Sequence, residues 1–408
     1  MRPTGAIERV SARGRTVVPG NPCEKVDADV AGSVGRELAA LLDEQLTYSA
    51  CLDGVFAREV AGPIARFTLE GGRRTRARLL WWAMRACGGG SAETASALRM
   101  AAAIELIQTC ALVQDDVMDG SPQRRGRASF HAQVAEEYRH VTAGASHAAS
   151  FAASAAILAG DLALSWADDI VAATDFPRGS RREVLDMWRC LRTEMVAGQY
   201  LDLHGQVTGS RSVIRSLQAA RLKTALYSVE RPMAFGAVIA DADAATLHGL
   251  RCAGRYAGIA FQLRDDLDSV FGDSLLTGKE SGEDIKAGKL TYLIAVARAR
   301  AEAQRNTYVM SVLDSAVGNA SLSPSDLQQV RDALADCGAR QAVEQRVARL
   351  GHLASRHLRA LDLHRTAADR LAELLHAVMA FEPTAPGEQE DDGAGSVLVA
   401  SVAHGGGR

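Results

Sequence analysis

The sequence predicts an all-α protein. Alanine is abundant among the 408 residues, whereas proline is rare (10 residues) and aromatic residues make up only 5%. Alanine is the strongest helix former and proline the strongest helix breaker, so this composition favours packed helices. Apolar residues recur every three or four positions, and few segments alternate with the period of two that is typical of a strand. These observations indicate one large all-α domain.

The helical period is clearest in six segments along the chain. In order, they are 37–46, 95–114, 157–172, 182–203, 216–229 and 368–380. Residues 1–30 lack this period and are expected to form a loose leader. The chain from 383, with its Pro, Gly and acidic residues, is expected to be a disordered tail. The helical domain is therefore predicted to span 31–382.

Composition excludes several classes of protein. The net charge of −3 argues against a nucleic-acid binder. Seven cysteines without a CxxC pair suit neither a disulfide framework nor a zinc site, which predicts a cytoplasmic protein. The N-terminus has arginines but no apolar core of a secretory signal. The uncharged Ala/Ser/Gly run at 143–160 is expected to be a buried helix rather than a membrane span.

The first acidic cluster lies in ALVQDDVMDGSPQRRGR, where Asp115, Asp116 and Asp119 end an apolar run. Because a helical turn takes about 3.6 residues, Asp115 and Asp119 project from the same face. Two stacked carboxylates repel each other unless a cation lies between them, and oxygen ligands suit Mg²⁺. Arg124 and Arg125 follow, which favours a diphosphate site over the alternative of a solvated helix end.

The second acidic cluster lies far downstream, in FQLRDDLDSVFGD. Asp265, Asp266 and Asp268 again end an apolar run, and Asp265 and Asp268 can share a helix face. Two such helices facing each other would form a site for three metal ions and one diphosphate. One cluster alone is weak evidence, whereas the pair with flanking cations is strong.

Cationic residues accompany both clusters. The segment GGRRTRARL (71–79) places Arg73 and Arg76 behind two glycines, whose backbone can approach an anion closely. Arginines at i and i+3 can then hold that anion from one side, although such a run in isolation is more often an exposed surface. Lys223, Lys279 and Lys289 add further positive charge.

In this order the motifs resemble the trans-isoprenyl diphosphate synthase (polyprenyl synthetase) family, and within it the bacterial geranylgeranyl diphosphate synthases. The matching segments are GGRRTR (71–76), Gln108, DDVMDGSPQRRG (115–126), GDLAL (160–164), GQYLDL (198–203), KTA (223–225), FQLRDDLD (261–268), TGK (277–279) and GK (288–289). The resemblance implies an orthogonal all-α bundle of the isoprenoid synthase type around a deep central pocket, and a homodimer. It also implies Mg²⁺-dependent, head-to-tail condensation of isopentenyl diphosphate with an allylic diphosphate.

The resemblance also implies a role for each matching residue. Asp115 and Asp119 would bind two Mg²⁺ ions and Asp265 a third, with Asp116 and Asp266 in support. The residues that match contacts to the allylic diphosphate are Arg124, Lys223, Thr224, Gln262, Lys279 and Lys289. Those that match the isopentenyl diphosphate site are Arg73, Arg76, Gln108 and Arg125. Gln199 and Asp202 match the lining of the reaction centre between the two substrates.

The residues fit this chemistry independently of the resemblance. Metal ions and fixed cations can stabilise the departing pyrophosphate, which is electrostatic stabilisation of the transition state. The isopentenyl double bond then attacks the allylic cation, and the released pyrophosphate can take the proton. An apolar pocket must exclude water from that cation.

Residues before the first cluster bear on product length. Cys110 and Ala111 lie about one helical turn before Asp115 and are expected to face the growing chain. Fifteen-carbon producers of the resembling family often carry an aromatic ring there, whereas bulky residues here lie deeper, at Ile107 and beyond. The best expectation is therefore the twenty-carbon product geranylgeranyl diphosphate, with longer chains as the main alternative.

The chain departs from the family pattern at three positions. Ser269 replaces the last carboxylate of the second cluster, Gln114 stands where histidine is frequent, and Ala77 where proline is usual. Two other activities stay open. A class I terpene cyclase would carry an Asn/Ser/Glu triad that we do not find, and a non-catalytic partner subunit would tend to lose the acidic clusters.

Overall fold

The computed structural model describes residues 22–124, 126–141, 145–272 and 281–380. The elements are α1 (Pro22–Ala28), α2 (Val30–Leu52), α3 (Gly54–Phe56), η1 (Ala57–Ala61), α4 (Gly62–Leu69), α5 (Thr75–Ala86), α6 (Thr94–Met118), β1 (Gln123–Arg124), β2 (Arg127–Ala128), α7 (Phe130–Glu137), α8 (Ala145–Ala173), α9 (Arg181–Thr208), α10 (Val213–Ala220), η2 (Arg221–Glu230), α11 (Arg231–Ile239), α12 (Ala244–Phe271), α14 (Glu283–Lys286), α15 (Tyr292–Gln304), α16 (Thr307–Ala316), α17 (Pro324–Asp336), α18 (Ala339–Arg359) and α19 (Arg365–Met379).

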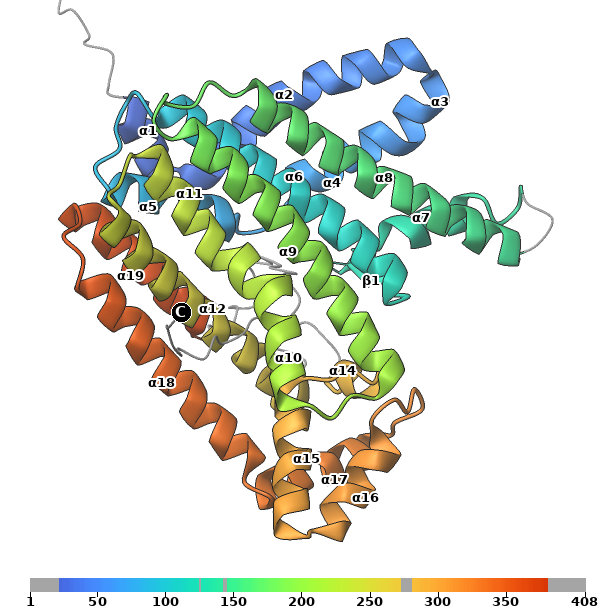
Figure 1. Cartoon of the computed structure of the whole chain (residues 1–408). Helices are drawn as coiled ribbons and strands as arrows, with labels where there is room; N and C mark the ends of the chain where they lie inside the picture. Colours follow the sequence, from blue (N-terminus) through green and yellow to red (C-terminus); the bar gives the residue numbers. More distant parts are fainter. Residues whose placement is uncertain (1–21, 125, 142–144, 273–280, 381–408) are drawn as a thin grey trace, which may run out of the picture.

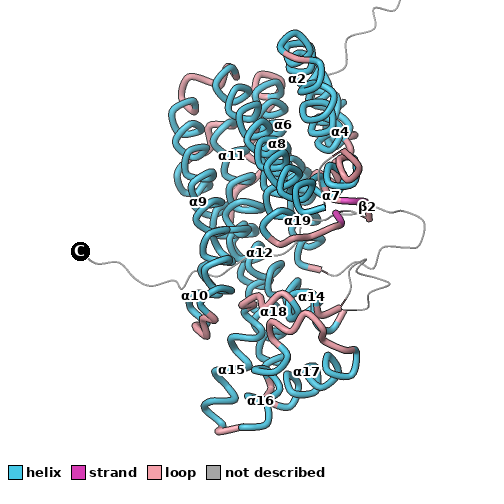
Figure 2. The backbone as a smooth tube through the Cα atoms, turned by 90° about the vertical axis from the view of Figure 1, so that its right-hand side faces the viewer, coloured by secondary structure: helices cyan, strands magenta, loops and turns pink. Residues whose placement is uncertain are grey.

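The described residues form a bundle of helices, which confirms the all-α prediction. In Figure 1, α6, α8, α9 and α11 run side by side, α18 and α19 flank them, and α15, α16 and α17 close one end. The described strands are two residues each and pair as an antiparallel hairpin. Figure 2, a view turned by 90°, shows this hairpin beside α7.

The predicted helical segments lie in helices except for Ala380, the C-cap residue of α19, but the N-terminal boundary differs. Residues 22–28, which were expected to belong to a loose leader, form α1, and Cys23 and Val26 are buried in the bundle (0% and 5% exposed). The two apolar side chains lie at i and i+3, on one face of this helix of about two turns, and that face docks on the bundle. The predicted tail at 383–408 and residues 1–21 lie outside the described residues.

The central helix of the bundle is α6, which carries the first acidic cluster. Buried residues occur on all its faces, from Thr94 to Asp116. It packs along α8 and against α5 and α2. A helix buried all round has little freedom to shift, so it fixes the position of the carboxylates at its C-terminal end.

Two of the described helices are long and apolar enough to cross a membrane by length and composition alone: Thr94–Met118 and Ser146–Ala173. The apolar window of the first is 83% buried, as in the core helix of a bundle, whereas that of the second is only 39% buried. The expectation of a buried helix is therefore wrong for the outer face of α8, where Phe151, Ile157 and Leu158 are exposed (46%, 47% and 64%).

The segment η2 is a π-helix that continues into α11. Two neighbouring helices approach its backbone very closely, and each does so at a glycine. A Cβ on Gly198 of α9 would lie 2.2 Å from the backbone N of Lys223, and one on Gly254 of α12 would lie 2.9 Å from the Cα of Glu230. The sequence thus permits η2 to be held tightly between α9 and α12.

Candidate active site

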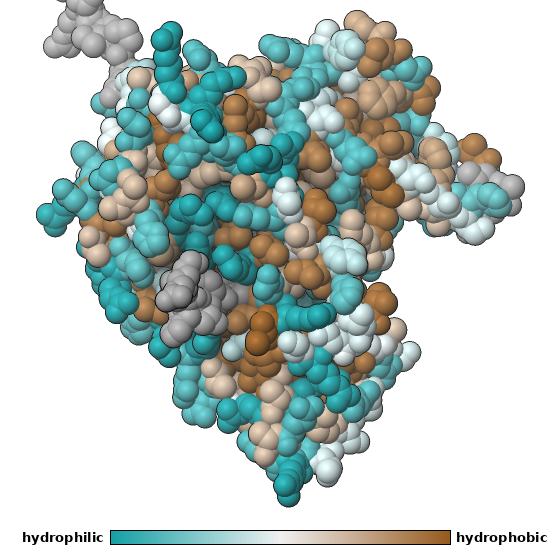
Figure 3. All heavy atoms as spheres, in the orientation of Figure 1, coloured by the Kyte–Doolittle hydropathy of each residue, from teal (hydrophilic) through white to brown (hydrophobic). Residues whose placement is uncertain are grey.

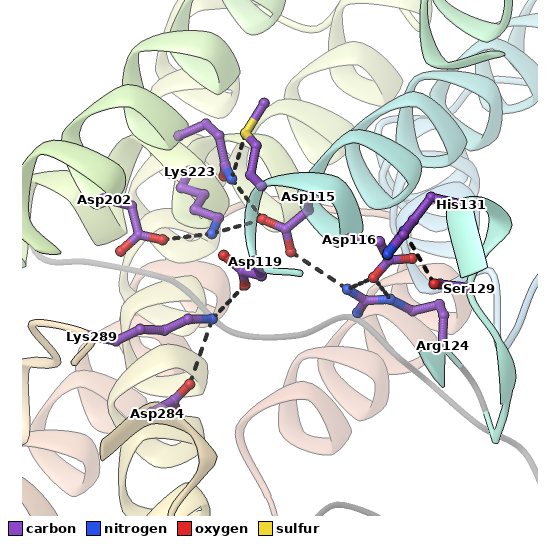
Figure 4. Close-up of polar contacts among 12 residues, drawn as sticks. Asp115, Asp116, Asp119, Arg124, Ser129, His131, Asp202, Lys223, Asp284 and Lys289 are labelled. Carbon is purple, nitrogen blue, oxygen red and sulfur yellow. Dashed lines mark hydrogen bonds and ion pairs between the residues drawn. The ribbon is translucent and has the colours of Figure 1, made fainter. Parts of the chain in front are cut away.

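The candidate site lies where α6 ends and where α9, η2 and the segment after α14 come together. Figure 4 shows Asp115, Asp119, Lys223, Asp202 and Lys289 pointing toward one another. Asp119 is the C-cap residue of α6. Residues far apart in the sequence therefore form one charged cluster.

Asp115 contacts cationic and amide groups from three other segments. Its Oδ1 accepts a hydrogen bond from Gln199 Nε2 (2.7 Å) and lies 3.2 Å from Lys223 Nζ, while its Oδ2 lies 3.5 Å from Arg124 Nη2. Burial alone would raise the pKa of Asp115, but Lys223, Lys289 and Arg124 outweigh burial and hold this pKa below its ordinary value. Asp115 is therefore an ionised, positioned carboxylate at neutral pH.

Two lysines each lie between two carboxylates. Lys223 Nζ donates to Asp202 Oδ2 (2.7 Å) besides contacting Asp115, and Lys289 Nζ lies 2.8 Å from Asp119 Oδ2 and 3.6 Å from Asp284 Oδ1. Burial opposes the charge on both lysines, but the surrounding carboxylates raise the pKa of each above its ordinary value. Both lysines are fixed positive charges.

Asp116 and Arg124 form a buried pair behind Asp115. Arg124 Nε and Nη2 donate to Asp116 Oδ1 at 2.8 and 2.5 Å. Burial raises the pKa of Asp116 to about 6, against the opposing effect of Arg124. The other oxygen, Asp116 Oδ2, is buried with no hydrogen-bond partner.

The second cluster sits near the C-terminal end of α12. Asp266 accepts hydrogen bonds from the backbone N of Tyr292 (2.7 Å) and from Gln262 Nε2. Burial, and then the charges of Asp284 and Asp265, raise the pKa of Asp266 to about 8. Asp284 thus lies between the two acidic clusters: its charge acts on Asp266 of the second, and it contacts Lys289, which pairs with Asp119 of the first.

Asp268, the carboxylate displaced from the family pattern, has an ion-pair partner within its own helix. It pairs with Arg264 of its own helix, Nε to Oδ1 at 3.2 Å. Ser269 Oγ donates to the backbone O of Asp266, 3.0 Å away. The displaced carboxylate therefore has a local partner within α12.

The donor chemistry fits a divalent cation. The carboxylates supply only oxygen ligands, and one buried oxygen of Asp116 has no hydrogen-bond partner. Burial, and then the neighbouring carboxylates, raise the pKa of Asp266. Among the residues that the structure describes, no group of three or more His, Cys, Asp and Glu side chains is close enough to hold an ion by itself.

A second group of predicted residues lies beside η2. Arg76 Nη2 donates to Ser228 Oγ (2.7 Å), and Tyr227 Oη donates to Gln108 Oε1 (2.7 Å). Thr224 is buried on the same segment (4% exposed). η2 thus carries Thr224, which is predicted for the allylic site, and contacts Arg76 and Gln108, which are predicted for the isopentenyl diphosphate site.

Arg74, between Arg73 and the start of α5, has a left-handed backbone (φ 49°) that is uncommon outside glycine. Its buried guanidinium contacts Glu105 Oε2 of α6 at 3.2 Å and donates to the backbone O of Leu69 at 3.0 Å. These bonds fix the turn that presents Arg73 and Arg76. The sequence offered no signal that separates Arg74 from its arginine neighbours.

The residues expected to set product length lie within α6. Cys110 and Ile107 are buried (1% and 0% exposed), and burial raises the pKa of the Cys110 thiol to about 12. A cavity of about 390 Å³ is lined by Asp202 and other residues of α9, by residues of α10 and by Leu290. It does not include Cys110, Ala111 or Ile107, so their role stays a prediction.

Two predicted site residues lie outside the described part of the chain, and two residues near the site were not predicted from the sequence. Arg125 and Lys279 lie outside the described residues. Asp284 and Tyr227 were not predicted, since their proximity to the site depends on the path of the chain. The only sequence signal for Asp284 was its place shortly before the GK at 288–289.

Comparisons with known proteins agree with this geometry. A family model described as polyprenyl synthetase matches residues 58–334. The geranylfarnesyl diphosphate synthase of Aeropyrum pernix is 30% identical over 290 residues, which cover 70% of this chain and 83% of that protein. The geranylgeranyl diphosphate synthase of Mycobacterium tuberculosis is 34% identical over 233 residues, 57% of this chain and 60% of that protein.

A solved structure extends the comparison to the fold. The geranylgeranyl pyrophosphate synthase of Corynebacterium glutamicum, complexed with isoprenyl diphosphate and magnesium, matches with a TM-score of 0.79 at 34% identity. The match covers 86% of this chain and 98% of that chain. The predicted all-α isoprenoid synthase fold is confirmed.

Proposed function

We propose that this chain, which belongs to the polyprenyl synthetase family of prenyltransferases, condenses isopentenyl diphosphate with an allylic diphosphate in an Mg²⁺-dependent reaction. The observation that carries the proposal is the charged cluster in which Lys223 and Lys289 each lie between two carboxylates. A diphosphate and its metal ions need this alternation of fixed cations and oxygen ligands.

Asp115, Asp119 and Asp265 are the residues proposed to hold Mg²⁺, three ions in each site. Bound Mg²⁺ would neutralise the charge that develops on the departing diphosphate. Lys223 and Arg124 would bind and orient the allylic diphosphate. Gln199 and Asp202 hold Asp115 and Lys223 in place through hydrogen bonds of 2.7 Å each.

On the second-substrate side, Arg73, Arg76 and Gln108 are proposed to bind isopentenyl diphosphate, with Arg125. The remaining residues of the proposed allylic site are Thr224, Gln262, Lys279 and Lys289. The buried apolar surface of α6 and its neighbours would keep water from the allylic cation.

The proposed product is geranylgeranyl diphosphate. Cys110 and Ala111 are small, and Ile107 lies one turn deeper in α6. Several similar proteins are named geranylgeranyl diphosphate synthases. The similarity to a geranylfarnesyl diphosphate synthase keeps a product one unit longer as the main alternative.

A homodimer is also part of the proposal. In Figure 3, apolar side chains gather over α8 and α9 on the face shown. The exposed residues there include Phe151, Ile157, Leu158 and Val196, each at least 46% exposed. Exposed apolar side chains grouped on two adjacent helices are typical of an interface.

We also propose a cytoplasmic location and a catalytic domain that spans 31–382 together with α1, whose Cys23 and Val26 belong to the same core. All seven cysteines are free thiols in the structure.

Incubation with labelled isopentenyl diphosphate and dimethylallyl, geranyl or farnesyl diphosphate tests the activity. The proposal predicts elongated diphosphates with Mg²⁺ and none with excess EDTA. A cyclised hydrocarbon would identify a terpene cyclase instead. The absence of any product would favour a non-catalytic partner subunit.

A further inference from the structure

Tyr227 contacts two of the residues proposed to bind isopentenyl diphosphate. It is the seventh residue of η2, and it is 3% exposed. Its hydroxyl contacts Gln108 of α6, and the guanidinium carbon of Arg76 of α5 lies 4.9 Å from the centre of its ring. One buried side chain therefore contacts both predicted ligands.

The hydroxyl of Tyr227 determines whether the oxygen or the NH₂ group of the Gln108 amide points toward a ligand. Burial raises the pKa of Tyr227, so the phenol stays protonated and can donate. It donates to Oε1 of Gln108 at 2.7 Å. An amide whose oxygen is occupied in this way presents its NH₂ group to a ligand, and an anion requires such donors.

The ring and the next residue hold Arg76 in a similar way. The guanidinium over the Tyr227 ring gains a cation–π interaction, and its Nη2 donates to Ser228 Oγ at 2.7 Å. The Nε of Arg76 is buried and has no hydrogen-bond partner. This geometry leaves a fixed guanidinium with a donor still to be satisfied.

We propose that Tyr227 is a positioning residue for isopentenyl diphosphate, which it orders by fixing Gln108 and Arg76 without touching the substrate itself. The inference rests on the proposed function. Lys223 and Thr224, four and three residues earlier on η2, belong to the proposed allylic side, so Tyr227 should act selectively on the other substrate.

The test compares Tyr227→Phe with the wild-type protein. The substitution keeps the ring under Arg76 and removes only the hydroxyl, which leaves the amide of Gln108 free to turn. Binding of isopentenyl diphosphate alone, measured by calorimetry without allylic substrate, should weaken about five- to tenfold, as expected for one lost hydrogen bond. The apparent KM for farnesyl diphosphate should change less than twofold.

A double-mutant comparison separates positioning from general destabilisation. If Tyr227 acts through Gln108, then Tyr227→Phe should cause little further loss of affinity in a Gln108→Ala background. Ser228→Ala, which removes a partner of Arg76, should weaken binding of the same substrate in both backgrounds. Tyr256→Phe is the matched control, since Tyr256 of α12 stacks on His357 of α18 with ring centres 5.4 Å apart.

The outcomes are distinct. Equal effects on both substrates, or full additivity with Gln108→Ala, would overturn the role of Tyr227. So would unchanged affinity for isopentenyl diphosphate in Tyr227→Phe. A wild-type protein that elongates no primer would instead contradict the proposed function.

Discussion

At the scale of single residues, each lysine of the cluster is already paired with carboxylates before any substrate binds. Lys223 pairs with Asp115 and Asp202, and Lys289 pairs with Asp119 and lies near Asp284. Binding of a diphosphate with its metal ions must therefore replace these lysine–carboxylate ion pairs: the lysines would then contact the diphosphate, and the carboxylates the metal ions. Each lysine then becomes available to the new anion without moving far.

Cys110 allows a sharp test at the same scale. Cys110→Phe should shift the product from twenty toward fifteen carbons, because an aromatic ring would shorten the channel beside α6. The rate of the first condensation should stay largely intact. Chromatography of dephosphorylated products from labelled isopentenyl diphosphate measures both. An unchanged product distribution would mean that Cys110 does not face the channel.

The sequence could predict the residues that carry charge, but not how they pair. Helical spacing predicted a shared face for Asp115 and Asp119, and the motifs pointed to Lys223 and Lys289. Asp284 and Tyr227 could not be predicted in the same way, because their partners come from distant segments. The pairing of Asp268 with Arg264 was accessible in principle, since an i, i+4 pair is local.

At the scale of elements, the position of η2 depends on its close contact with α9. Gly198→Ala would bring a Cβ within 2.2 Å of the backbone N of Lys223. Because backbone must shift to relieve this contact, we expect a loss of at least about 2 kcal/mol in the free energy of unfolding and a lower kcat. Gly54→Ala is the matched control, since a Cβ there meets nothing within 4 Å. Urea unfolding and steady-state rates of both variants provide the check, and an unaffected Gly198→Ala would show that η2 is not held at this point.

The other end of η2 is held by a buried ion network. Glu230 is 0% exposed and accepts hydrogen bonds from Arg255 (2.7 and 3.0 Å) and Arg251 (3.0 Å), both of α12. Burial opposes its charge, but these arginines and Arg231 hold the pKa of Glu230 below its ordinary value. The network ties η2 to α12.

Glu230→Gln should therefore lower the free energy of unfolding by about 3 kcal/mol at pH 7. Because the pKa of Glu230 is lower in the folded state, its contribution is present above the unfolded pKa of about 4.3 and is lost as pH falls through the folded value. Denaturant unfolding at several pH values should show the two proteins converging below about pH 4. A constant difference across this range would contradict the ionic origin.

At the scale of the whole molecule, the exposed apolar face of α8 and α9 predicts the dimer. Leu158→Glu places a charge in the proposed interface and should convert dimers to monomers, which sedimentation velocity can measure. Tyr308→Glu on α16, where the side chain is 58% exposed and the helix packs against α15 and α17, should leave the dimer intact. A Leu158→Glu protein that sediments as a dimer would place the interface elsewhere.

The fold class was predictable because composition and apolar period both favour helices. The arrangement of the helices was accessible only through the resemblance, since apolar spacing shows that a face is buried but not which helix covers it. The outer face of α8 is an example: its Ala/Ser/Gly run predicted burial, yet Ile157 and Leu158 are exposed in the single chain. The π-helical turn of η2 was likewise invisible, because no residue type demands it.

The central claim is that both acidic clusters serve one diphosphate site. It is tested most directly by the rate at which Asp265→Ala extends farnesyl diphosphate with labelled isopentenyl diphosphate and Mg²⁺, with Asp268→Ala as the comparison. We predict that Asp265→Ala loses at least about 10²-fold in kcat, the scale of one electrostatic stabiliser, and that Asp268→Ala loses much less. A near-normal rate for Asp265→Ala would contradict the two-sided site.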